Sequence, residues 1–192
     1  MSSKITITLL AGNTFRARAY AQQLAQLNHD EVIVKGFFYG FQKRPITEVV
    51  LDDRTKNYLI KEDLFVPDLN ESIKTTYDHN KWGYAEYKDD NVNDENLITE
   101  LNKIKTDIIV FAGYGGQLLR SGHFMTGTKY LHMHPGILPF ERGSTTLYYS
   151  ILNNRNLGVT AFYMTEKIDE GVNVLSKEYR APSKGVNIDV WL

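Results

Sequence analysis

Two histidines, His132 and His134, stand two residues apart in the second half of the chain. On a β-strand this spacing directs both imidazoles to the same face, because side chains alternate with a period of two. Pro135 and Pro139 follow, and prolines make a segment stiff and extended. Histidine is the side chain that most readily changes charge near neutral pH. The pattern therefore favours proton transfer beside a fixed wall, although a single histidine of this kind can also be purely structural.

A carboxylate that can serve one of these histidines lies further along. Asp169 occurs in the sequence Ile168-Asp169-Glu170-Gly171, which is typical of a turn between two strands. A carboxylate beside a histidine orients the ring and makes it a better proton acceptor. We therefore expect His134 and Asp169 to act together. The alternative is that Asp169 only stabilises the turn.

The surrounding segments alternate between strand and helix patterns. Strand-type runs cover residues 5–10, 32–37, 108–112, 130–133, 159–164 and 172–179. Helical patterns begin at Thr14, at 93–95 and at Thr145, with Asn13 or Thr14 as the first N-cap. Strand, helix and strand in close succession predict a parallel βαβ unit. The fold class expected is α/β, with an open, doubly wound, mostly parallel sheet of the Rossmann-like kind.

In such sheets ligands bind beyond the carboxyl ends of the strands. Three loops stand at these ends: Gly12-Asn13, the segment 113–117, and the segment from His132 onward. Gly115 and Gly116 allow a close approach of the backbone to a ligand. A plain tight turn explains the glycines of the first two loops equally well.

The segment 40–93 has no long period and is polar and aromatic. It is either an insertion that shapes a pocket or an irregular surface excursion. Its tyrosines and Trp82 either contact an acceptor molecule or are half-buried packing residues.

Four motifs of the second half resemble those of the 10-formyltetrahydrofolate-dependent N-formyltransferases, in that family's order and spacing. They are His134–Pro139, Arg142-Gly143, Gly158-Val159-Thr160 and Ile168–Gly171. The family includes methionyl-tRNA formyltransferase, glycinamide ribonucleotide transformylase and the sugar-nucleotide N-formyltransferases, and this chain is most similar to the last. The resemblance covers about residues 108–175. It implies the formyltransferase fold, an N-formyltransferase activity and 10-formyltetrahydrofolate as the formyl donor.

The resemblance also implies catalytic residues. The family uses an asparagine, a histidine two residues later and a distant aspartate. His134 matches the histidine and Asp169 the aspartate, whereas His132 stands where the family has asparagine. In formyl transfer, donors must lie where the oxyanion develops and a base must take the amine proton. A histidine can donate one hydrogen bond to that oxygen, but its shape differs from that of an amide.

Binding residues follow from the same resemblance. Two segments match the walls of the family's folate pocket: Tyr114, Gly116, Gln117 and Leu118 in one, and Glu166, Lys167 and Ile168 in the other. Gly12 and Asn13 resemble the loop that binds the acceptor phosphate in some relatives.

The resemblance implies that the acceptor is a small primary amine, and we expect an amino-sugar nucleotide. The chain shows neither the extra domain nor the basic surface of methionyl-tRNA formyltransferases. The replacement at His132 leaves two alternatives. One is a metal-dependent enzyme with iron or zinc on His132, His134 and Asp169. The other is a catalytically weakened homologue that binds folate or a sugar.

Composition sets the remaining expectations. A chain of 192 residues suits a single catalytic domain. The net charge of -1 gives no electrostatic reason for a nucleic-acid or membrane partner, and the absence of cysteine excludes disulfides and thiolate sites. No signal segment is recognisable, so we expect a cytoplasmic protein; its oligomeric state is unknown. Residues 188–192 resemble the start of a helix, so the chain is either truncated or naturally short.

Overall fold

The computed structural model describes residues 4–27, 30–46, 51–143, 145–154 and 156–187. The expected helix start at 188–192 lies outside the described residues. The chain divides into two compact units. The first consists of Met1–Val50 and Pro67–Lys129, and the second of Leu51–Val66 and Tyr130–Leu192.

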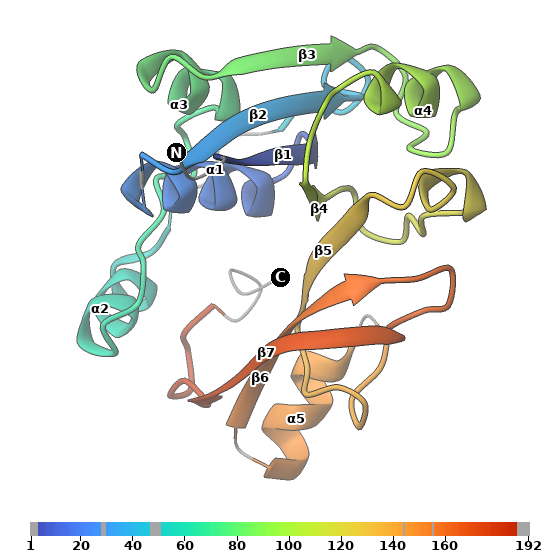
Figure 1. The fold of residues 1–192 in the computed structure, drawn as a ribbon. Coiled ribbons are helices and arrows are strands. Elements are labelled where there is room, and N and C mark those ends of the chain that lie inside the picture. Colours follow the sequence, from blue (N-terminus) through green and yellow to red (C-terminus); the bar gives the residue numbers. More distant parts are fainter. Residues whose placement is uncertain (1–3, 28–29, 47–50, 144, 155, 188–192) are drawn as a thin grey trace. The chain divides into compact units, whose positions relative to one another are not determined.

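The first unit contains a sheet of parallel strands in the order β3-β2-β1-β4 (Figure 1). The strands are β1 (Ile5–Gly12), β2 (Val32–Tyr39), β3 (Gly83–Tyr87) and β4 (Ile108–Ala112). Leu9 and Leu10 in the middle of β1 are fully buried, as expected for a strand flanked by β2 and β4. Because the strands are parallel, the loops after Gly12, Tyr39 and Ala112 all leave from one edge of this sheet.

Helices α1 (Phe15–Leu27), α3 (Ile73–His79) and α4 (Glu95–Asn102) and a 3-10 turn η1 (Ser121–His123) complete this unit. The predicted βαβ unit is confirmed as β1, α1 and β2. Thr14 rather than Asn13 caps α1, since its Oγ1 accepts a hydrogen bond from Ala17 N at 3.1 Å. The predicted helix start near Glu95 is also confirmed: Asp94 accepts hydrogen bonds from the first backbone N–H groups of α4.

Three aromatic residues of the middle segment, Tyr77, Trp82 and Tyr84, pack together in the first unit. Tyr77 is fully buried and meets Phe38 edge-to-face at 5.0 Å and Trp82 at 5.2 Å. Tyr84 stacks on the same Phe38 at 5.0 Å. For these three rings the structure shows packing, one of the two roles that the sequence offered.

The second unit contains β5 (Lys129–His134), β6 (Asn156–Met164) and β7 (Gly171–Arg180), paired antiparallel in that order, with α5 (Thr146–Asn154) between β5 and β6. Helix α2 (Asp53–Lys61) belongs here although it comes from the middle segment. Its Tyr58 hydroxyl donates to Arg180 O at 3.0 Å, and Asn187 N donates to Thr55 Oγ1 at 3.0 Å. The sequence pattern did not predict α2.

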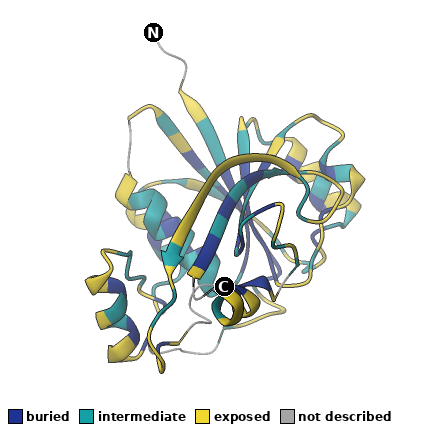
Figure 2. Cartoon of the chain, turned by 90° about the horizontal axis from the view of Figure 1, so that it is seen from below, coloured by how far each residue is buried: buried dark blue, intermediate teal, exposed yellow. Residues whose placement is uncertain are grey.

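The buried residues concentrate on β1, β2 and β4, while the helices expose one side (Figure 2). The predicted α/β class with an open, mostly parallel sheet is confirmed, and β6 pairs antiparallel with both β5 and β7. Among the described residues, no helix has the length and apolar character needed to cross a membrane.

Candidate functional site

His132 and His134 lie on the same face of β5, as their spacing predicts. Their partners on β6 are Phe162 and Thr160. Both imidazoles meet the Phe162 ring edge-to-face, His132 at 6.0 Å and His134 at 6.5 Å between ring centroids. Phe162 is 1% exposed. One buried aromatic ring therefore supports both histidines.

His134 lies between two acceptors. Its Nδ1 is 3.5 Å from Asp169 Oδ1, and its Nε2 is 2.6 Å from the backbone oxygen of Glu141. The side chains of His134 and Asp169 are only 3% and 13% exposed, so this pair is largely shielded from solvent. A carbonyl oxygen can only accept a hydrogen bond, so Nε2 carries a proton. In the neutral ring, Nδ1 is then the nitrogen with a free electron pair, and it faces the carboxylate.

Asp169 is held by its backbone and by the loop after β5. Its φ of 50° lies in the left-handed region, which aspartate tolerates better than most residues. Its Oδ2 accepts a hydrogen bond from Gly143 N at 2.7 Å. Gly171 has a φ of 152°, and a Cβ there would lie 1.9 Å from Tyr163 O. The turn that carries Asp169 thus requires the glycine that ends its motif.

The loop 135–139 is fastened to β6 by the third motif. The Thr160 hydroxyl donates to Gly136 O at 2.7 Å and accepts from Leu138 N at 3.1 Å. A Cβ on Gly158 would lie 2.4 Å from Cγ1 of Ile137, so only glycine leaves room for the loop. The motifs around His134 and Thr160 are therefore two sides of one contact, which keeps the segment after His134 in place.

Among the described residues, no group of three or more histidine, aspartate or glutamate side chains is arranged to hold a metal ion. The alternative of a metal site on His132, His134 and Asp169 consequently has no geometric support.

The first predicted folate wall follows β4 in the first unit. The Tyr114 hydroxyl accepts from Asn13 N at 2.9 Å and donates to Tyr39 O at 3.2 Å. Gln117 accepts from the Tyr39 hydroxyl at 2.7 Å and donates to Asp90 O at 2.6 Å. Burial raises the pKa of Tyr39 and of Tyr114, so both hydroxyls stay protonated. Tyr114 and Gln117 thus fasten the loop with their side chains.

The rest of this loop is open. A Cβ added to Gly115 or Gly116 would meet nothing within 4 Å, and Leu118 is 53% exposed. The backbone at both glycines therefore borders open space, and the Leu118 side chain is exposed beside it.

The Gly12-Asn13 loop has a structural partner in Tyr114. A Cβ on Gly12 would lie 2.8 Å from the Tyr114 ring. Asn13 donates through its backbone N to Tyr114 and through Nδ2 to Arg44 O at 3.1 Å. The Arg44 guanidinium lies 4.6 Å above the Tyr114 ring. These donors of Asn13 are therefore already used within the first unit.

The second predicted wall, Glu166, Lys167 and Ile168, forms the turn between β6 and β7 in the second unit. All three residues are exposed, Ile168 by 55%. Lys167 Nζ lies 3.5 Å from Glu170 Oε2. These side chains stand directly before Asp169 and are not part of the core.

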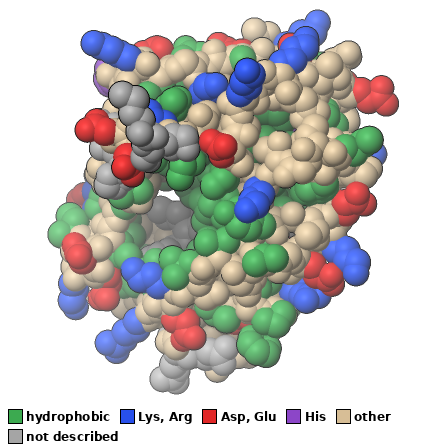
Figure 3. Space-filling view, in the orientation of Figure 1, with side chains coloured by type: hydrophobic (Ala, Val, Ile, Leu, Met, Phe, Trp, Pro, Cys, Tyr) green, Lys and Arg blue, Asp and Glu red, His purple; other side chains and the backbone are tan. Residues whose placement is uncertain are grey.

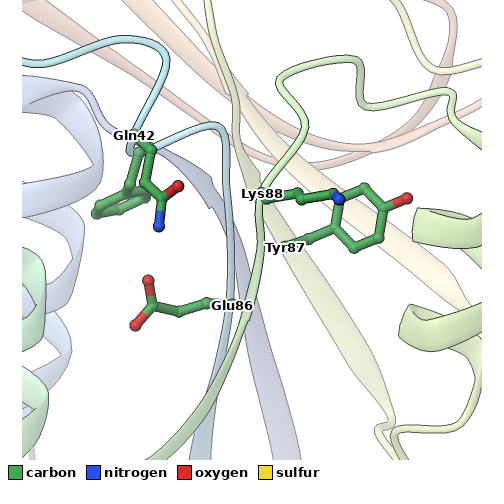
Figure 4. A pocket seen from close by; sticks show the side chains of 5 residues that line it. Gln42, Glu86, Tyr87 and Lys88 are labelled. Atoms are coloured by element: carbon green, nitrogen blue, oxygen red, sulfur yellow. The ribbon is translucent and has the colours of Figure 1, made fainter.

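A pocket of about 130 Å³ lies in the first unit at the ends of β2 and β3 (Figure 4). Its lining residues are Phe41, Gln42, Glu86, Tyr87 and Lys88. None of these was predicted as a site residue. The pocket is formed by the middle segment, so this part of the segment does shape a pocket, one of the two roles that the sequence left open.

The chain was compared with known proteins. A profile described as Formyl transferase matches residues 45–184. Methionyl-tRNA formyltransferase of Bacillus velezensis is 37% identical over 86 residues, which cover 43% of this chain and 26% of that protein. The enzyme of the same name from Halothermothrix orenii is 30% identical over 101 residues, covering 52% of this chain and 32% of that protein. The matches thus span about a third or less of these relatives.

Solved structures agree on the fold. Glycinamide ribonucleotide transformylase 1 from Symbiobacterium toebii superposes with a TM-score of 0.67 at 14% identity, covering 100% of this chain and 80% of that one. A sugar N-formyltransferase from a Shewanella species gives a TM-score of 0.55 at 17% identity, covering 91% and 57%. These identities support the fold alone. The profile match covers well over half of the chain, and the family expected from the motifs is confirmed: this chain belongs to the formyl transferase family.

Proposed function

We propose that the protein transfers a formyl group from 10-formyltetrahydrofolate to the primary amine of a small acceptor, and that this acceptor is an amino-sugar nucleotide. The observation that carries the proposal is the pair of His134 and Asp169, 3.5 Å apart, on a loop fixed by Thr160 and Gly143. A buried histidine with one nitrogen facing a carboxylate is suited to take a proton from an attacking amine.

In the proposed reaction, the acceptor amine forms a bond to the formyl carbon and the carbonyl oxygen becomes negative. Nδ1 of His134 takes the proton that the amine loses, and Asp169 stabilises the resulting imidazolium. His132 donates a hydrogen bond to the oxyanion, in the position that the family gives to an amide. When the oxyanion collapses, the bond to the folate nitrogen breaks, and the proton held by His134 is delivered to that nitrogen.

Two observations support this choice of acceptor. The formal net charge is -1, and basic and acidic side chains are interspersed on the face seen in Figure 3, which does not favour a polyanion such as tRNA. A sugar N-formyltransferase is among the structural relatives.

Methionyl-tRNA is the competing acceptor, because the relatives matched in sequence carry that name. The test is to incubate the protein with 10-formyltetrahydrofolate and, separately, a 4-amino-4,6-dideoxyhexose nucleotide, glycinamide ribonucleotide or methionyl-tRNA. Formylated product is detected by mass spectrometry, with His134→Ala as the inactive control. Product from the amino sugar supports the proposal, whereas product from methionyl-tRNA alone replaces the acceptor.

The same assay separates catalysis from binding. If no acceptor is formylated while tetrahydrofolate binds by calorimetry, the protein is a weakened homologue, and His132→Asn should then gain activity. If the wild type already turns over, the binding-only alternative is rejected.

A further inference from the structure

Glu141 connects three parts of the second unit through both its backbone and its side chain. Its backbone oxygen accepts the Nε2–H of His134 at 2.6 Å. Its Oε2 accepts a hydrogen bond from Ile137 N at 2.8 Å, and its Oε1 accepts one from the Ser150 hydroxyl. Ser150 lies on α5 and is 3% exposed. No sequence motif pointed to Glu141, because its contact with His134 is made by a carbonyl group that every residue possesses.

The carboxylate of Glu141 determines where its own carbonyl points. The loop closes with Glu141 N donating to Ile137 O at 3.0 Å, while the side chain returns to Ile137 N. Ile137 is therefore hydrogen-bonded to Glu141 through both its N–H and its C=O. The bond to Ser150 ties the same carboxylate to a buried position of α5. The Glu141 carbonyl consequently has little freedom to turn away from His134.

This matters because the two acceptors around His134 compete for one proton. A neutral imidazole has a single N–H, on either Nδ1 or Nε2. The Asp169 carboxylate at 3.5 Å alone favours the proton on Nδ1, where it would block the nitrogen that must accept from the amine. The Glu141 carbonyl at 2.6 Å favours the proton on Nε2. The balance between these acceptors decides whether Nδ1 of His134 is free to accept a proton from the amine.

We propose that Glu141 is a positioning residue that keeps neutral His134 in the Nε2–H form, so that Nδ1 stays free to accept a proton. Which nitrogen of the His134 ring carries the proton does not depend on the proposed function. Its consequence for turnover rests on the proposed formyl transfer.

The test measures the ring directly, by ¹⁵N NMR of the His134 side chain at a pH where the ring is neutral. We expect the wild type to give a protonated Nε2 and an unprotonated Nδ1. Glu141→Ala removes both carboxylate bonds, and both nitrogens should then shift toward intermediate values. Glu141→Gln can still accept from Ile137 N and should retain the wild-type pattern. Glu178→Ala on exposed β7 is the matched control.

Backbone spectra verify that each variant is folded. If Glu141→Ala were unfolded, Ser150→Ala, which removes only one of the two bonds, would be measured and should give a smaller shift in the same direction. An unchanged Nε2–H population in a folded Glu141→Ala protein overturns the proposal.

Kinetics form the second readout. With the acceptor found active, Glu141→Ala should lower kcat on the order of 10²-fold with KM little changed, because the base is misoriented while the substrates still bind. Glu141→Gln should restore most of kcat. A shifted tautomer with an unchanged kcat overturns the catalytic consequence. If the wild type transfers no formyl group, the proposed function fails, and the NMR arm still decides the role of Glu141.

Discussion

Asp169 holds Gly143 N through Oδ2 at 2.7 Å while its Oδ1 lies 3.5 Å from Nδ1 of His134. Each oxygen of the carboxylate thus has its own task, one for the loop and one for the imidazole. Since Gly143 has a φ of 102°, the loop reaches Asp169 in a conformation that side chains with a Cβ rarely adopt. The motifs around Gly143 and Asp169 are separated in sequence but depend on each other in space.

Asp169→Asn tests what the negative charge of Asp169 contributes to the action of His134. The amide oxygen can still accept from Gly143 N, so the loop should stay in place, whereas the negative charge beside His134 is lost. We expect kcat for formyl transfer to fall by about 10²- to 10⁴-fold. Thermal unfolding should change little. Glu170→Gln changes the neighbouring, partly exposed residue that pairs with Arg142; it is the control and should keep its activity. Unchanged turnover in Asp169→Asn would contradict the proposed role.

His132 is tested by two replacements that differ in their ability to donate. His132→Leu keeps an apolar contact with Phe162 but offers no donor to an oxyanion, and kcat should fall by about 10²- to 10³-fold. His132→Asn restores the family's amide, so its kcat should be within about tenfold of the wild type on the same scale. Steady-state kinetics at saturating folate provide the comparison. If His132→Leu retains full activity, His132 only packs against Phe162.

Gly158→Ala probes the contact between β6 and the loop after His134. The added methyl group would lie 2.4 Å from Cγ1 of Ile137 and 3.0 Å from its backbone N, so the loop must move. Overpacking of this kind costs about 1–3 kcal/mol in the free energy of unfolding. Gly83→Ala is the matched control, because a Cβ there meets nothing within 4 Å. Chemical denaturation of both variants gives the difference; equal stability would mean that the loop yields without cost.

Acid should destabilise the first unit through His123. Its side chain is fully buried, burial lowers its pKa below 6.5, and the hydrogen bond from Nε2 to Val92 O offsets this only in part. Above pH 6.5 the ring is neutral in both the folded and unfolded states. As the pH falls below 6.5, the unfolded state binds a proton more readily, so the free energy of unfolding decreases until the folded pKa is reached.

The measurement compares thermal or urea unfolding at pH 7 and pH 5. His123→Gln removes the titrating ring, so the free energy of unfolding should depend less steeply on pH. The slope should decrease by at most about 1.4 kcal/mol for each pH unit. The exposed His79→Gln should leave the slope as in the wild type. An equally steep loss in His123→Gln would assign the acid sensitivity to other groups.

The regular elements could be predicted wherever one pattern ran through a whole element. Strand β4 was predicted with its bounds, and β1, β5, β6, β7, α1 and α5 within a few residues. Strands β1 and β4 owe their continuous apolar runs to burial on both faces, whereas α1 owes its helical period to one buried face with Ala17 and Ala21. The segment 40–93 could not be interpreted, because its elements α2, α3 and β3 are short and belong to different units.

The site could be predicted only in part, for a different reason. His134 and Asp169 were found because their motifs have side chains of recognisable chemistry. Glu141 acts through its carbonyl and Phe162 through a packing face, and neither contact has a sequence signature. Tyr114, predicted to bind folate, also fastens the Gly12-Asn13 loop through its hydroxyl, a contact between distant residues that spacing cannot reveal.

Helix α2 gives the order of synthesis a consequence for folding. The chain leaves the first unit after Val50, contributes Leu51–Val66 to the second, and returns at Pro67. On the ribosome, α2 emerges long before its partners Arg180 and Asn187, while the strands of the first sheet are complete once Ala112 has been made. The second unit can therefore assemble only late, and until then α2 remains joined at both ends to segments of the first unit.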